Sequence, residues 1–370
     1  MPTRTTPPFR ADHVGSLLRS AALKAARVDR ARGAITPDEL REIEDCEIAA
    51  LIARQEAVGL KSITDGEFRR KSWQTDFISA LPGIETVPHQ RKVRFQGGVQ
   101  PQQVLTRVTR KLGDFTDHPM IDHFRFVAAH TRQTPKMTIP SPSALHFRDG
   151  REAVPASVYP DIADFYRDLG ATYRKAVRAF ADAGCRYLQL DEVNLTYLCD
   201  PTLVQKVRGR GEDPAALLEA YAGMINTAIA DIPADMTITM HLCRGNFRST
   251  FVASGGYEPV AETMFNAIGV HGYFMEFDSD RAGGFEPLRF VPKGKTVVLG
   301  LVTSKTGILE NKDEIRRRID EAAKYVPLEQ LCLSPQCGFA STEEGNVLAE
   351  EEQWAKLRMI VELADEIWGR

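Results

Sequence analysis

The sequence has little surplus charge and no long apolar run. Its 47 lysines and arginines nearly balance its 50 aspartates and glutamates, which leaves a formal net charge of −3. That charge provides no global field to attract nucleic acid or an anionic membrane, so neither is an expected partner. No segment approaches the roughly 18 apolar residues that span a bilayer, and the opening MPTRTTPPFR lacks the apolar stretch of a secretory signal. We therefore expect a cytoplasmic protein that acts on a small molecule.

Cysteines are also sparse, and linkers are missing. Six cysteines in 370 residues are too few for a disulfide framework, so each thiol is free to pack or to bind a metal. No internal repeat, low-complexity tract or Gly/Ser-rich linker marks a domain boundary. With 43% hydrophobic residues, the chain can bury one large core, and we predict a single domain over residues 1–370.

Short apolar segments alternate with stretches of helical period, which is the pattern of parallel strands joined by crossover helices. The number of candidate strands equals that of a (β/α)8, or TIM, barrel. The predicted fold is therefore an α/β TIM barrel, with strands near Ala11–Gly15, Leu60–Asp65, Lys136–Pro140, Tyr187–Asp191, Met236–His241, Gly272–Glu276, Thr296–Val302 and Gln330–Ser334.

Amphipathic segments lie between these strands or after the last one, and Thr36 is expected to cap the first of them. The stretch Pro82–Gln133 differs because it is basic and polar, with Gly97 and Gly98 between two alternating runs. It predicts a hairpin insertion after the second strand. Its basic residues are expected on a solvated face, and the alternative is that they meet an anionic tail of the substrate. The predicted helices are Pro37–Val58, Ile162–Ala183, Pro214–Asp231, Glu258–Ile268, Lys312–Tyr325 and Glu343–Ile367.

The reactive groups of a parallel barrel gather where its strands end, because the following loops face one pocket. His241 and Cys243 in HLCRGN alternate along one strand, so their side chains point to the same side. Cys337 in LSPQCG follows the eighth strand, and Glu276 in MEFDSD ends the sixth, so the four can converge. One imidazole, two thiolates and a carboxylate suit Zn²⁺. The alternative from the residues alone is two buried thiols and a core histidine.

Five motifs occur in the order in which they are found in the cobalamin-independent methionine synthases. The chain resembles the C-terminal catalytic barrel of that family from VGS at 14–16 to CGF at 337–339. The resemblance implies that His241, Cys243, Glu276 and Cys337 are zinc ligands. The motifs are DGEFRR (65–70), LQLDE (188–192), HLCRGN (241–246), MEFDSD (275–280) and LSPQCG (333–338).

The resemblance also implies a homocysteine site. Gly15 and Ser16 match the turn that holds the amino-acid carboxylate, and Glu67 and Asp191 match the carboxylates that hold its ammonium group. Charge complementarity agrees with this assignment, because paired carboxylates complement an ammonium and backbone N–H groups complement a carboxylate. From the residues alone, Asp191 and Glu192 are either an acid/base couple or part of a capping turn after the strand.

Two positions depart from the family pattern. Phe147 stands where the family has a tryptophan against the folate ring, and a phenyl ring offers less area for stacking. Lys305 stands where the family has a histidine thought to assist proton delivery, so Lys305 is a minor catalytic candidate. A lysine titrates far from neutrality unless it is buried. These changes do not touch the residues expected to activate the thiol. They leave the identity of the methyl donor open, which is either methyltetrahydrofolate or another compound.

The sequence thus predicts a zinc-dependent methyltransferase similar to 5-methyltetrahydropteroyltriglutamate–homocysteine S-methyltransferase. In this hypothesis zinc turns homocysteine into a thiolate, which is methylated to methionine. A second hypothesis is alkyl transfer to another thiol, as in epoxyalkane:coenzyme M transferases. The acidic Glu67 and Asp191 argue against it, because a sulfonate thiol calls for arginine or lysine. A third hypothesis is a non-catalytic zinc-binding barrel.

Overall fold

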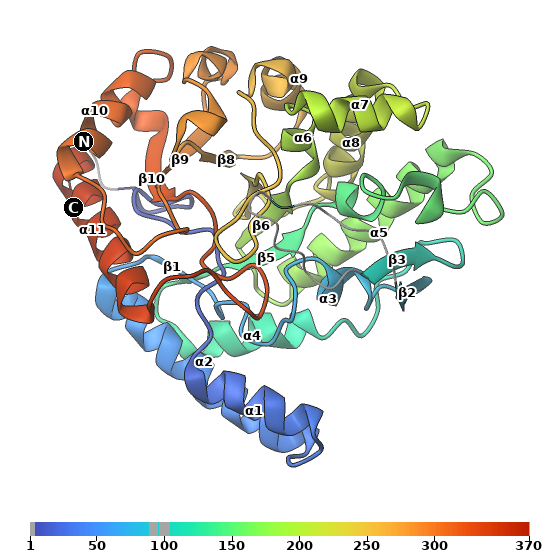
Figure 1. The fold of residues 1–370 in the computed structure, drawn as a ribbon, viewed down its shortest axis with the longest axis horizontal. Helices are drawn as coiled ribbons and strands as arrows, with labels where there is room; N and C mark the ends of the chain where they lie inside the picture. The colour runs from blue at the N-terminus through green and yellow to red at the C-terminus, as the bar shows by residue number, and fades with distance from the viewer. Residues whose placement is uncertain (1–3, 89–94, 96–103, 370) are drawn as a thin grey trace.

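The protein is an α/β fold built on parallel strands, with helices outside them (Figure 1). The computed structural model describes residues 4–88, 95 and 104–369. Within these residues, none of the helices combines the length and apolar character needed to cross a bilayer. The prediction of an α/β fold with a parallel sheet is confirmed.

Six neighbouring strands form the parallel sheet, in the order β10-β9-β8-β7-β6-β5. From β5 to β10, each strand therefore lies next to the strand that follows it in the chain, as expected where a crossover on the outside joins neighbouring strands. The strand segments are mostly apolar, and every residue of β9, TVVLGLV, is buried. Burial on both faces explains these continuous apolar runs. The strands are β5 (Met137–Pro140), β6 (Tyr187–Glu192), β7 (Thr237–Leu242), β8 (Gly272–Glu276), β9 (Thr296–Val302) and β10 (Leu331–Pro335).

The two predicted N-terminal strands lie at the ends of this sheet. β1 (Ser62–Ile63) pairs in parallel with β4 (Thr134–Pro135), which leads directly into β5. At the other end, Ala11 forms a parallel bridge to Leu333 of β10. The first segment then reaches the loop after β1 through Leu17, whose N–H donates to the Gly66 carbonyl. The strand order is that of the predicted barrel, and its closure by a continuous ladder stays a prediction.

The helices largely follow the predicted ranges, and their ends have clear causes. Thr36 and Glu39 form a capping box at the start of α2. The last helix begins at Glu350, seven residues after the predicted Glu343, because Gly345 adopts a left-handed φ of 72° that breaks a helix there. The helices are α1 (Ala21–Ala31), α2 (Pro37–Val58), α3 (Thr75–Ile78), α4 (Met120–His130), α5 (Ile162–Asp182), α6 (Asn194–Tyr197), α7 (Pro201–Gly209), α8 (Pro214–Ala228), α9 (Glu258–Ala267), α10 (Lys312–Ala322) and α11 (Glu350–Trp368), with short 3-10 turns η1 (Pro142–Leu145), η2 (Gly150–Glu152), η3 (Asp280–Ala282), η4 (Glu286–Phe290) and η5 (Leu328–Gln330).

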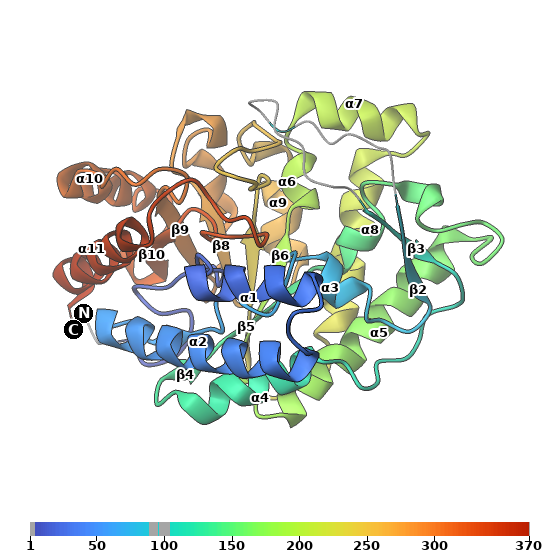
Figure 2. The same ribbon diagram turned by 60° about the horizontal axis from the view of Figure 1, so that its bottom comes forward.

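The predicted insertion contains an antiparallel pair and a helix. β2 (Ile84–Pro88) pairs with β3 (Val104–Val108), on the side away from the chain termini (Figure 2). The predicted turn at Gly97 and Gly98, with the basic residues Arg91, Lys92 and Arg94, lies outside the described residues, so the hairpin stays a prediction. The second part of the range forms α4, which packs against α2 and α5.

Gly300 lets the strands of the site approach one another. It pairs with Glu276 of β8 and Ser334 of β10. A Cβ at this position would lie 2.7 Å from the Gln336 Cα and 2.8 Å from the Met275 carbonyl oxygen. These neighbours are backbone atoms, so they cannot turn aside as a side chain could.

We expect Gly300→Ala to lower the free energy of unfolding by about 1–3 kcal/mol, because the methyl group overpacks the sheet. Urea unfolding of the purified variant measures this change. The control is Gly223→Ala on the exposed face of α8, where an added Cβ has no neighbour within 4 Å. The control should gain about 0.5–1 kcal/mol from its better helix propensity. Equal stability of Gly300→Ala and the native protein would contradict the packing argument.

Candidate metal centre

Three strand ends bring four potential metal ligands together. His241 lies in β7 and Cys243 directly follows that strand, while Glu276 is the last residue of β8. Cys337 comes two residues after β10. All four side chains are buried, and one ligand atom from each lies within 4.8 Å of the others. The sequence prediction that these residues converge at the strand ends therefore agrees with the geometry.

The distances within this cluster fit one tetrahedral zinc ion. The Cys243 and Cys337 sulfur atoms are 3.5 Å apart, and the His241 Nε2 lies 3.4 Å from the Cys337 sulfur. Bonds of about 2.3 Å to sulfur and 2.0–2.1 Å to nitrogen would place these pairs roughly 3.8 and 3.6 Å apart. Both cysteines are free thiols. The donor set of nitrogen, two sulfurs and oxygen also suits zinc.

The cluster favours thiolate character at Cys337. The Cys243 thiol donates to its sulfur, and His241 lies beside it, so the pKa of Cys337 falls well below its usual value despite burial. The same contact with Cys337, together with burial, raises the pKa of Cys243 well above its usual value. Burial also raises the pKa of Glu276, but Lys305 and Arg281 outweigh it and lower that pKa overall. A cation at this point would meet ionised Cys337 and Glu276 and would have to displace the proton of Cys243.

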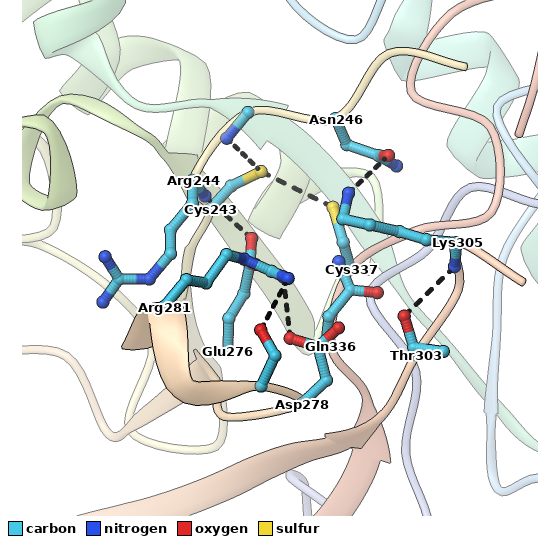
Figure 3. A network of polar contacts seen from close by, with 12 residues as sticks. Cys243, Arg244, Asn246, Glu276, Asp278, Arg281, Thr303, Lys305, Gln336 and Cys337 are labelled. Carbon is cyan, nitrogen blue, oxygen red and sulfur yellow. Dashed lines mark hydrogen bonds and ion pairs between the residues drawn. The ribbon is translucent and has the colours of Figure 1, made fainter. Parts of the chain in front are cut away.

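Outer contacts fix the ligands, as Figure 3 shows. The Gly245 N–H donates to the Cys243 sulfur at 3.3 Å. Both oxygens of Glu276 accept hydrogen bonds, one from the Arg244 N–H at 2.7 Å and one from the Arg281 guanidinium at 2.8 Å. Arg281 was not predicted from the sequence, although it follows directly after MEFDSD.

The cluster opens onto a cavity of about 1440 Å³. This volume exceeds the roughly 300–1,000 Å³ of ordinary small-molecule sites. Among the predicted site residues, Gly15, Glu276 and Lys305 do not line this cavity. The predicted site residues that do line it are Ser16, Glu67, Asp191, His241, Cys243 and Cys337.

Glu67 and Asp191 form an acidic pair in the cavity wall. Glu67 has a left-handed φ of 61°, and its Oε1 accepts from the Thr138 hydroxyl at 3.1 Å. Its other oxygen, Oε2, is buried and has no hydrogen-bond partner in the described structure. Burial raises the pKa of Asp191 to about 7, and the charge of Glu67 adds to this rise against the opposing effect of His241. Burial likewise raises the pKa of Glu67. The pair therefore favours a cationic ligand group.

Gly15 and Ser16 lie beside this pair at the end of the first strand segment. Gly15 has a φ of 133°, and a Cβ there would come within 2.7 Å of the Thr138 side chain. Ser16 packs so closely on Gly338 that a Cβ on Gly338 would meet the Ser16 hydroxyl at 2.0 Å. The turn is thus held next to the loop that carries Cys337.

The two departures from the family pattern occupy different places. Phe147 lines the cavity and packs against Tyr197, with ring centroids 5.8 Å apart. The Lys305 ammonium instead donates to the Asn246 side chain and the Thr250 carbonyl, both at 3.1 Å. Asn246 lines the cavity, so Lys305 reaches the site through that residue. The catalytic role of Lys305 stays a prediction.

Fold and site together define an α/β protein with a candidate metal centre rich in thiols at its strand ends. The sequence profile described as "Cobalamin-independent synthase, Catalytic domain" matches residues 154–366. The chain belongs to the cobalamin-independent methionine synthase family, as the predicted resemblance indicated.

Similar proteins cover nearly the whole chain. The uncharacterized protein YxjH of Bacillus subtilis (strain 168) is 49% identical over 98% of this chain and 95% of its own length. A crystal structure from Listeria monocytogenes, assigned to the vitamin-B12-independent methionine synthases, is 44% identical. It superposes with a TM-score of 0.80, over 99% of this chain and 100% of that one. The methionine synthase of Pyrococcus abyssi (strain GE5 / Orsay) is 25% identical, over 84% of this chain and 80% of that protein.

The raised pKa of Asp191 predicts a stability that depends on pH. The ordinary pKa of 3.8 rises to about 7 in the folded protein, so the unfolded chain releases this proton first and stability falls as pH rises between these values. Asp191→Asn has no such proton to release, so its free energy of unfolding should not fall in this way. In metal-free protein, the free energy of unfolding of the variant minus that of the native protein should rise by about 2 kcal/mol from pH 5 to pH 8. Urea titrations at both pH values measure this, with the exposed Asp122→Asn as control; an unchanged difference would contradict it.

Proposed function

We propose that this protein is a zinc-dependent methyltransferase that converts homocysteine to methionine. The observation that carries the proposal is that three members of the four-residue cluster, His241, Cys243 and Cys337, line the same cavity as the acidic pair. The proposal includes a closed (β/α)8 barrel formed by residues 1–370 as one catalytic domain. Membership of the methionine synthase family supports the reaction class.

His241, Cys243, Glu276 and Cys337 would hold the zinc ion. Bound zinc would supply a thiolate at neutral pH, because a coordinated thiol loses its proton. Cys243 and Cys337 line the cavity, whereas Glu276 lies behind it. This arrangement leaves one side of the cluster facing the substrate, which is the reason to prefer catalysis over a purely structural or regulatory zinc site.

The acidic pair would bind the amino-acid end of homocysteine. The unpartnered Glu67 Oε2 and the neighbouring Asp191 carboxylate would accept hydrogen bonds from the ammonium group. Ser16, on the turn after Gly15, would bind the carboxylate. The same acidic pair disfavours the alternative thiols that end in a sulfonate, because like charges repel.

The rest of the cavity would receive the methyl donor. Its volume leaves room for a large second substrate beside homocysteine. Phe147 and Tyr197 would provide aromatic surface for the donor, either methyltetrahydrofolate or another compound. Lys305 would act indirectly, by fixing Asn246 and by contributing positive charge near Glu276.

Zinc-edge X-ray absorption on the purified protein tests the proposal directly. We expect two sulfur ligands in the loaded protein and three after homocysteine is added. Cys337→Ser should weaken zinc binding by more than about tenfold. Cys332→Ala is the control, because Cys332 is buried in β10 outside the cluster and should leave zinc binding unchanged. Protein that binds no zinc, or a zinc shell that homocysteine does not alter, would disprove the proposed reaction.

Glu67 offers a separate test of substrate orientation. Glu67→Gln removes one charge opposite the ammonium group, so the Kd of homocysteine should rise roughly 10- to 100-fold, as for loss of a charged hydrogen bond. Binding of 4-mercaptobutyrate, which lacks the amino group, should change little. Glu343→Gln, on the cavity wall and paired with Arg27, is the control. Equal losses for both thiols would show that Glu67 does not recognise the ammonium group.

A further inference from the structure

Glu276 is the one member of the metal cluster for which the described residues provide an ion-pair partner. The Arg281 Nη2 lies 2.8 Å from Glu276 Oε2, and the Glu276 side chain is fully buried. Figure 3 shows Arg281 reaching across to this carboxylate from the turn η3 that follows β8. A guanidinium and a metal ion both bind a carboxylate through its oxygen lone pairs, so they compete for its negative charge.

Arg281 is itself shared between two carboxylates. The same Nη2 donates to Asp278 Oδ1 at 2.7 Å, and Nη1 donates to the Ser279 hydroxyl at 2.8 Å. The guanidinium also lies over the Phe251 ring, 5.0 Å from its centroid. Asp278 is almost as buried as Glu276. Arg281 therefore divides its hydrogen bonding between Asp278 and Glu276, which weakens its interaction with Glu276.

We propose that Arg281 and Asp278 together set how strongly Glu276 binds the metal. In this arrangement Arg281 weakens Glu276 as a ligand, and Asp278 limits that weakening. Arg281 is thus a positioning residue that keeps Glu276 exchangeable while the two sulfurs and the imidazole hold the metal. The inference rests on the proposed function, because it takes the cluster to be a zinc site.

Two variants should shift zinc affinity in opposite directions. Arg281→Met removes the charged hydrogen bond that competes with the metal for Glu276, so zinc affinity should rise about tenfold. Asp278→Asn leaves Arg281 to Glu276 alone, so zinc affinity should fall by a similar factor. Competition with a chromophoric zinc chelator measures both. General damage to the fold would lower affinity in both variants, so opposite signs exclude that explanation.

Zinc-edge absorption provides a second measurement. With homocysteine at a concentration that gives three sulfur ligands in half of the native protein, Arg281→Met should retain mainly two sulfurs and its oxygen ligand. Asp278→Asn should shift toward three. Arg289→Met is the matched control, because Arg289 on η4 pairs with Glu258 at the surface and should leave both measurements unchanged.

The outcomes separate this inference from the proposed function. Affinity changes of opposite sign, with the control unchanged, support the roles of Arg281 and Asp278. A native protein that gains a third sulfur, with both variants behaving like it or both losing zinc affinity, would overturn the inference and leave the proposed function intact. A native protein that binds no zinc would overturn both.

Discussion

Burial of several acidic ligands at one point is the constraint on which this site depends. Cys243, Cys337 and Glu276 can carry three negative charges within one buried cluster, and such charges are costly to bury unless cations or hydrogen bonds compensate them. A divalent metal would supply two positive charges. Arg281 contacts Glu276 directly, and Lys305 lowers the pKa of that carboxyl. The surrounding side chains therefore provide the balance that the cluster lacks by itself.

The parallel sheet places the charged residues of the site close to one another. Asp191 of β6 is in register with His241 of β7, and Glu276 of β8 is in register with Gly300 of β9. Adjacent strands lie about 4.8 Å apart, so Asp191 of the acidic pair is one strand spacing from the candidate ligand His241. A short molecule with a thiol at one end and an ammonium group at the other matches this spacing. Gly300 permits the close approach that keeps Glu276 near the loop of Cys337.

The sequence predicted the parts of this site that follow strand periodicity. His241 and Cys243 alternate along one strand, and Glu276 and Cys337 end or follow others, so their convergence follows from parallel strands alone. Contacts within the loops follow no such period. The Arg281 ion pair and the hydrogen bond from Lys305 to Asn246 depend on how each loop turns. For the same reason the start of α11 was misplaced, since Glu343 and Gly345 read as helical in sequence but belong to the loop after β10.

The four candidate ligands differ in whether they line the cavity, and this difference bears on what a bound metal could do. A structural zinc site is closed on all sides by its protein ligands. Here Cys243 and Cys337 face a large cavity, while Glu276 lies behind the wall and is tied to Arg281. A thiol would thus approach from the side of the sulfurs, and the residue with a cationic partner, Glu276, is the one of the four that does not line the cavity. This asymmetry would suit a metal centre in which the bond from the metal to Glu276 weakens when a new sulfur ligand binds. A purely structural metal site would not require it.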